Sequence, residues 1–158
     1  MNNPFSTPLT EYLDQQQVAY RLLPHQTPAT TIEDAAMQRG IQAQQMVKSI
    51  LLRDMGDLYA LACVPGNQSV DPKKARAVLN CRRMTCVNLA DVPTITGYQI
   101  GCVAPLLLLK SMPILMDPEL TTHDEVTISS GSNMAGIALK PSDLIQLCQP
   151  ILVDLCKS

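Results

Sequence analysis

The chain has 158 residues, of which 46% are hydrophobic and 16% charged, so we expect one domain with a buried core and exclude extensive disorder. Aromatic residues make up 3%, with no Trp, which argues against proteins that stack bases on aromatic rings. The formal net charge of -2 provides no general attraction for a polyanion, so any contact with nucleic acid has to be local.

The first half of the chain predicts two helices and then a pair of strands. An apolar stripe predicts a helix over residues 7–17, and a short strand follows at 19–23. Thr30 or Thr31 can cap a second helix, which Gly40 ends. Strands are predicted at 46–53 and 58–64, with a hairpin turn between them at 54–57. The second of these strands is apolar on both faces, which predicts a central place in the sheet.

The second half predicts one more capped helix and then mostly strands. Asp71 caps a helix that has Pro72 at its first position and runs to about Leu79. Residues 94–109 read as irregular, and we predict a helix at 141–149 and another in the amphipathic tail at 151–156. Further strands are predicted at 83–88, 112–116, 125–129 and 137–140. The order indicates an α+β fold, with helices around a mixed sheet.

Localisation and metal-binding signals are weak or missing. The polar start of the chain does not resemble a signal peptide, and the longest apolar run, 103–109, is too short to cross a membrane. The six cysteines include no C-x-x-C pair and only two histidines occur, so we expect no metal site and no cofactor. Reduced thiols and a cytoplasmic location are the expectation.

Lys48 is the first candidate functional residue. Because side chains alternate along a strand, it shares a face with Met46, Ile50 and Leu52, whereas Ser49 lies on the other face. Buried lysines are rare unless paired or functional, and burial lowers the pKa of an amine, which suits it to chemistry or to holding an anion. The alternative is a lysine at the strand end that extends its amine to water.

Two loops with glycine are further candidates. The loop from Gly101 to Pro105 can present backbone amides to a carbonyl or oxyanion, although an ordinary turn has the same pattern. Gly131 begins a loop of small residues that either lines a pocket or only turns the chain. The basic residues gather after position 71 and form either a solvated helix face or a phosphate contact. These candidates for a phosphate contact are Lys73, Lys74, Arg76, Arg82 and Arg83, and the resemblance described next makes them candidates for contact with tRNA.

Six short motifs, in their order along the chain, resemble the YbaK family of aminoacyl-tRNA deacylases, which includes the editing domain of bacterial prolyl-tRNA synthetases. The resemblance covers roughly residues 9–147. The motifs are VKSILL at 47–52, VDPKK at 70–74, GY at 97–98 followed by G-x-x-x-P at 101–105, PILMD at 113–117, SG at 130–131 and LKPSDL at 139–144.

The resemblance implies a mixed α+β domain with a partly closed, barrel-like sheet. It implies hydrolysis of the ester that joins a wrong amino acid to tRNA, commonly tRNA for proline that carries Ala or Cys. Family members are thought to use a hydroxyl or thiol of the substrate rather than a strong protein base. The implied catalytic positions are Lys48 and Gly101. The implied substrate-binding positions are Cys102, Val103, Ala104, Pro105, Gly131, Ser132 and Asn133, and we add His25 from the loop before the second helix.

The partners follow from this resemblance. We expect the acceptor end of a mischarged tRNA, no membrane, and an aminoacyl-tRNA synthetase that hands over the substrate in trans. Residues 1–158 read as a single domain, and the tail after Pro150 could be a homodimer contact or the stub of a longer chain. The alternative is a binding or regulatory module without catalysis on the same scaffold.

Overall fold

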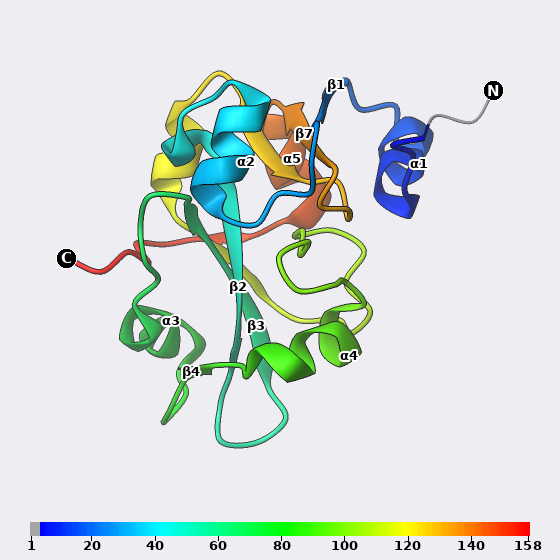
Figure 1. Ribbon diagram of the computed structural model, residues 1–158. Coiled ribbons are helices and arrows are strands. Elements are labelled where there is room, and N and C mark those ends of the chain that lie inside the picture. Colours follow the sequence, from blue (N-terminus) through cyan, green and yellow to red (C-terminus); the bar gives the residue numbers. More distant parts are fainter. Residues whose placement is uncertain (1–3) are drawn as a thin grey trace.

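Two sheets that meet at one strand form the centre of the computed structural model, which describes residues 4–158 (Figure 1). One sheet has the strand order β1-β7-β6 and is antiparallel, and the other has the order β4-β2-β3-β5-β8 and is mixed. The strands are β1 (Tyr20–Pro24), β2 (Val47–Arg53), β3 (Tyr59–Pro65), β4 (Thr85–Cys86), β5 (Ile114–Met116), β6 (Val126–Ser129), β7 (Ala135–Leu139) and β8 (Ile151–Leu152).

Five α-helices surround the sheets within residues 4–158. The helices are α1 (Pro8–Gln15), α2 (Ile32–Arg39), α3 (Pro72–Leu79), α4 (Val92–Thr96) and α5 (Pro141–Cys148). Three short 3-10 turns lie between them, at η1 (Ala43–Gln45), η2 (Leu89–Asp91) and η3 (Pro118–Thr122). This arrangement confirms the predicted α+β class. None of the helices in the described part of the chain is long and apolar enough to cross a membrane.

The β2 strand connects the two sheets. It forms a long antiparallel hairpin with β3, in which Lys48 lies opposite Val64. At its start, Met46 makes a parallel bridge to Thr127 of β6. This bridge brings the edge of the small sheet to the large one and gives the partly closed, barrel-like arrangement. As predicted, β3 is central and almost entirely buried, because β2 and β5 pair with its two edges.

The aliphatic core falls into three clusters, because α2 and α3 cover separate parts of the sheets. The main cluster lies between the sheets and includes Val47, Leu51 and Leu61. A second cluster lies under α3 and includes Leu52, and a third lies under α2 and includes Met46. The two faces of β2 therefore pack against different neighbours: one faces the main core, and the other meets the clusters under α2 and α3.

Most predicted helix caps are present. Thr31 accepts a hydrogen bond from the amide of Asp34 at 3.0 Å, and Gly40 ends α2 in the left-handed conformation with φ of 71°. Asp71 accepts from the amide of Lys73 at 3.0 Å. The prediction of irregular chain from residue 94 onward missed α4, although this helix has Pro93 in its first turn and Gly97 as a left-handed C-cap.

The predicted helix in the tail is wrong. Ile151–Leu152 pair with β5 in parallel as β8, and Cys156 forms an antiparallel bridge with Val70. The buried carboxylate of Asp117 fixes this path, because its Oδ2 atom accepts the amide of Leu155 at 2.9 Å. Its Oδ1 atom accepts the amide of Glu119 at 3.0 Å and so begins the 3-10 turn after β5. An apolar tail beside an unpaired strand edge forms a strand, since the edge offers it backbone partners.

The Asp117 contact yields a stability prediction. Asp117→Ala leaves the buried amide of Leu155 unpaired and removes a cap, so we expect the free energy of unfolding to fall by about 2–4 kcal/mol. Urea denaturation followed by circular dichroism measures this change. Arg21→Met breaks only the exposed ion pair between Arg21 and Glu125, and should change the midpoint little. A similar loss in the two variants would show that Asp117 is not an anchor of the tail.

Candidate active site

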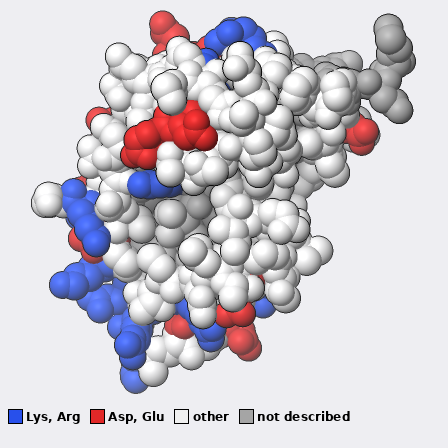
Figure 2. Space-filling model, viewed as in Figure 1, with Lys and Arg blue, Asp and Glu red and all other residues white. Residues whose placement is uncertain are grey.

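A cavity of about 550 Å³ opens between α2, β2 and the loops that follow β4 and β6. Figure 2 shows a hollow in this face of the molecule, with basic and acidic side chains near its edge. This volume is in the range of ordinary small-molecule sites. The lining is mostly apolar, and among the described residues it contains the two cations Arg39 and Lys48 and no carboxylate.

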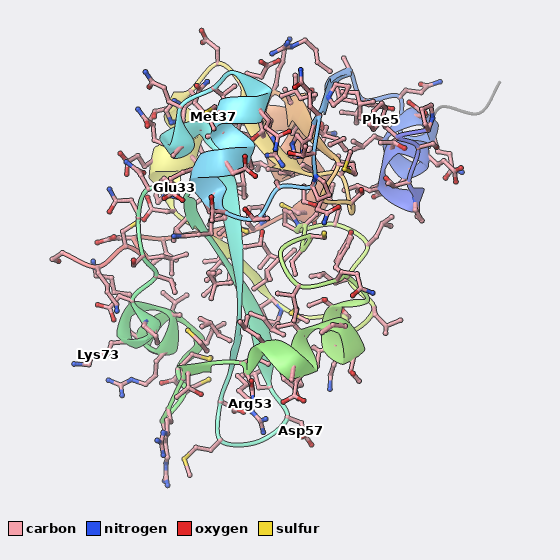
Figure 3. The ribbon with its side chains drawn as sticks, in the orientation of Figure 1. Phe5, Glu33, Met37, Arg53, Asp57 and Lys73 are labelled. Atoms are coloured by element: carbon pink, nitrogen blue, oxygen red, sulfur yellow. The ribbon has the colours of Figure 1, made fainter. Side chains whose placement is uncertain are left out.

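Lys48 reaches this cavity from the start of β2, where it is the second residue of the strand. On its face of the strand, Met46 belongs to the cluster under α2, and Leu52 to the cluster under α3. Lys48 lies where these two clusters leave a gap, and it is half-buried. Burial lowers the pKa of its ammonium, whereas Cys156 and Glu33 act in the opposite direction. Glu33 lies on α2, as Figure 3 shows, and supplies negative charge beside a cation that remains accessible.

The loop after α4 brings Gly101 and Val103 to the cavity. Gly101 has φ of +82°, a conformation that disfavours other residues, and open space where a side chain would stand. The amide of Cys102 donates to the carbonyl of Gln99 at 3.0 Å. Within residues 4–158 the amides of Gly101 and Val103 make no such bond. These two amides are therefore candidates to bind a carbonyl oxygen.

Three other residues of this loop are buried away from the cavity. Cys102, Ala104 and Pro105 have little or no exposed surface, and Ala104 belongs to the main core cluster. Burial also raises the pKa of the Cys102 thiol. The Tyr98 hydroxyl donates to the carbonyl of Leu106 and so ties the two ends of the loop together. Their position indicates that these residues shape the loop, whereas the lining comes from Gly101 and Val103.

The loop between β6 and β7 forms another wall. Of the three residues predicted in this loop, Ser132 and Asn133 line the cavity, whereas Gly131 does not. Gly131 has φ of +94°, and a side chain there would stand 3.4 Å from the Tyr98 ring. This glycine thus lets the β6–β7 loop approach the loop after α4. The two predicted glycine loops are neighbours in space.

His25 lines the cavity and is 4% exposed. Its Nδ1 atom is 2.8 Å from the Asn133 carbonyl oxygen, and its Nε2 atom accepts from Nε of Arg39 at 3.1 Å. These partners require a neutral ring with the proton on Nδ1. Burial is the main cause that lowers the pKa of His25, and the charge of Arg39 adds to it, while the Asn133 carbonyl and Asp34 oppose it. Because both nitrogens are engaged, His25 is a connector rather than a free base.

Arg39 is the lining residue that the sequence analysis missed. It lies in the last turn of α2, where a basic residue is ordinary for a helix end, so no local pattern distinguishes it. In the fold its Nη1 atom donates to Thr127 Oγ1 at 3.0 Å, and burial lowers its pKa to about 10. Gly136 on β7 makes this position possible, because a methyl group there would overlap the guanidinium. Gly136 gave no signal from sequence, because the strand was predicted to begin at residue 137, after this glycine.

The basic residues lie on α3 and in the segment that leads to β4, at one side of the molecule (Figures 2 and 3). Lys74 is engaged, since its Nζ atom pairs with Asp154 at 2.9 Å and donates to the Cys156 carbonyl. Lys73, Arg82 and Arg83 are exposed. Cys86, in β4, lines the cavity, so the chain runs from this basic surface to the cavity mouth within a few residues.

The chain is a small α+β domain with a cavity between a helix and a strand hairpin. A family model, the aminoacyl-tRNA editing domain, matches residues 26–147. The chain belongs to this family.

Two known proteins are similar to this chain in amino-acid sequence. "Uncharacterized protein YwhH" of Bacillus subtilis (strain 168) is 30% identical over 134 residues, which are 84% of each protein. "Putative Cys-tRNA(Pro)/Cys-tRNA(Cys) deacylase EbsC" of Enterococcus faecalis (strain ATCC 700802 / V583) is 25% identical over 73% of this chain and 70% of that one.

Solved structures agree on the fold. The crystal structure of "a putative trans-editing enzyme for prolyl tRNA synthetase" matches with a TM-score of 0.85 and 24% identity over the full length of both chains. The structure of a hypothetical protein matches with a TM-score of 0.88 and 21% identity, over 94% of this chain and 99% of that one. At these identities the similarity establishes the YbaK-like fold only. The chemistry has to be argued from the residues of the site.

The contacts of His25 yield a prediction on pH. We expect its NMR titration midpoint to lie below the ordinary 6.5, because burial disfavours the imidazolium. The unfolded chain then binds the proton more readily than the folded one, so the stabilisation from neutral His25 is present above pH 6.5 and is lost as the pH falls toward the lower folded value.

The measurement is an NMR titration of the ring signals. A His123→Gln variant identifies which of the two histidine signals belongs to His25. A His25 midpoint at or above 6.5 would contradict the hydrogen bond from Arg39.

Proposed function

We propose that this protein hydrolyses the ester bond between a wrong amino acid and tRNA, and that the cavity at Lys48 is the active site. The observation that carries the proposal is the placement of Lys48, an accessible ammonium in a largely apolar cavity whose lining also includes Gly101 and Val103, two residues with free backbone amides. The family, and the printed name of the Enterococcus faecalis relative, support a deacylase. The tRNA would be one for proline that carries a small residue such as Ala or Cys.

The geometry suggests how the substrate would lie. Lys48, at the gap between two packing clusters, can hold a phosphate or the ribose of the tRNA end. The amides of Gly101 and Val103 can bind the ester carbonyl and stabilise the negative oxygen that forms when water attacks. A bond then forms between the water oxygen and the carbonyl carbon, the bond to the ribose oxygen breaks, and the ribose regains a proton.

No strong protein base stands ready in this arrangement. His25 uses both ring nitrogens, and the cavity lining within residues 4–158 contains no carboxylate. We therefore assign the proton transfer to water and to polar groups of the substrate itself. The role of the protein is to orient the ester, supply hydrogen bonds to the oxyanion and exclude bulk water.

The alternative of a module without catalysis predicts that side chains fill the pocket. The cavity is open, with Lys48 and Gly101 on its walls, which favours the hydrolase. We propose that the protein works in the cytoplasm, where charged tRNA is found. A synthetase that delivers the substrate and a homodimer through the β8 edge remain predictions.

The ammonium of Lys48 yields the first activity prediction. Lys48→Met removes a charge-assisted contact but keeps an unbranched side chain, so kcat/KM for deacylation should fall about 10- to 100-fold. The assay follows release of radiolabelled amino acid from mischarged tRNA. Lys48→Arg should retain more activity than Lys48→Met.

The matched control is Lys140→Met. Lys140 is exposed at the start of α5 and outside the cavity, so its loss should leave the rate unchanged. Equal activity of wild type and Lys48→Met would refute the assigned role. Absence of any deacylation by wild type, over tRNAs charged with Ala, Cys and Ser, would refute the proposed function.

The exposed basic surface yields a second prediction. If Arg82 and Arg83 contact tRNA phosphates, the double change to Gln should raise KM and leave kcat nearly constant. The slope of log KM against log salt concentration should decrease by about one for each lost phosphate contact. Measurements at several KCl concentrations test this. A fall in kcat with unchanged KM would place the role of these residues elsewhere.

A further inference from the structure

Two large hydrophobic side chains are exposed where the cavity opens to solvent. Leu89 is 63% exposed and Ile100 is 52% exposed, and both line the cavity. The other large hydrophobic side chains that are exposed among residues 4–158 do not line it. A lining side chain with more than half of its surface in solvent has to lie at the opening. Exposed apolar surface that is gathered at a groove is typical of a ligand site.

The backbone holds Leu89 outside the core. Leu89 begins η2 between Val87 and Val92, which are both 6% exposed and belong to the main core cluster. The amide of Val87 also donates to the carbonyl of Leu51 at 3.0 Å, which fixes this segment to β2. Because the two valines fill the core, Leu89 stays at the cavity.

Ile100 stands in a tight turn of the loop after α4. The amide of Cys102 donates to the carbonyl of Gln99 at 3.0 Å, and Gly101 has φ of +82°. A hydrogen bond across four residues, with positive φ at the third, is the pattern of a type II turn, and Ile100 is its second residue. The amide of Gly101 belongs to the peptide unit that joins it to Ile100. This side chain therefore lies beside one of the two amides that we assign to the ester carbonyl.

The cavity is larger than the amino acid of the proposed substrate requires. Its volume of about 550 Å³ is enough for a drug-sized ligand, whereas Ala and Cys have two of the smallest side chains. The space that remains has to receive another part of the aminoacyl-tRNA. Because the lining is mostly apolar, it suits the flat ring of a base better than a ribose or a phosphate.

The position of the last nucleotide follows from its two neighbours. It joins the phosphates of the tRNA to the ester, so its base lies near both. The phosphate candidates Arg82 and Arg83 precede η2, and Gly101 follows α4. Leu89 and Ile100 lie between them in the chain, in the segment that Figure 1 shows running from β4 into α4 and the loop beyond it.

We propose that Leu89 and Ile100 bind the terminal base of the tRNA through apolar contacts. This inference rests on the proposed function, because it assigns the outer part of the same cavity to the nucleoside that carries the ester. Aliphatic side chains form no hydrogen bonds, so the contact selects by the area of the ring and not by the identity of the base. The order of affinity is therefore a purine first, then a pyrimidine, then a ribose without a base.

The test uses three stable compounds in which Ala is joined by an amide bond to the 3′ position. The carriers are adenosine, cytidine and a methyl riboside that has no base. Calorimetric titration gives a Kd for each. In wild type we expect the Kd of the riboside compound to exceed that of the adenosine compound about 10-fold, with cytidine between them. In the double variant Leu89→Ser and Ile100→Ser this ratio should approach one.

The matched control is Leu109→Ser. Leu109 is 72% exposed in the loop after α4 and does not line the cavity, so all three Kd values should stay unchanged. Circular dichroism checks that the double variant is folded, as expected for two exposed positions. Equal Kd values of wild type for the adenosine and riboside compounds would overturn the inference. An equal loss of affinity for all three compounds in the double variant would also overturn it, because the cavity as a whole would then be altered.

A hydrolysis assay separates this inference from the proposed function. The base is bound in the ground state and in the transition state alike, so with Ala-charged tRNA the double variant should have a KM about 10-fold higher and a nearly constant kcat. If wild type hydrolyses the ester and the double variant has an unchanged KM, the base contact is wrong while the proposed function stands. If wild type hydrolyses no ester but binds the three compounds in the expected order, the proposed function is wrong while the base contact stands.

Discussion

The packing around β2 determines where this protein can bind a ligand. The strand belongs to a long hairpin with β3, and its start is also bridged to the small sheet. One face fills the main core through Val47 and Leu51, while the other face meets two separate clusters under α2 and α3. Between these two clusters the face is left open to the cavity. The gap contains Lys48, and the cavity extends from it, so the site follows from the division of the core.

The strand pattern around Lys48 predicted its setting well, because alternation is a local property. The hairpin, the central position of β3 and the cap at Asp71 could be predicted for the same reason, since each depends on neighbours in sequence. The tail could not. Its apolar pattern fits a helix or a strand, and the decision came from the free edge of β5 and the carboxylate of Asp117.

The residues of the candidate site also fall into two groups: those with a local sequence signal and those that only distant contacts identify. Backbone features with their own signature, such as Gly101 and the β6–β7 loop, were found from sequence, and the structure brings them to one cavity. Arg39 was missed because its environment consists of His25, Thr127 and Gly136, which lie 14, 88 and 97 positions away along the chain. Only tertiary contacts distinguish this residue from the surface arginines. Cys102, by contrast, has the right neighbours in sequence, but the path of the loop turns it into the core.

Charge links these observations. The whole chain carries a net charge of -2, yet the cavity lining has two cations and no carboxylate among the described residues. Each cation has a different surrounding. Burial lowers the pKa of Lys48, and Glu33 and Cys156 partly offset this effect. Burial also lowers the pKa of Arg39, and no other group offsets it there.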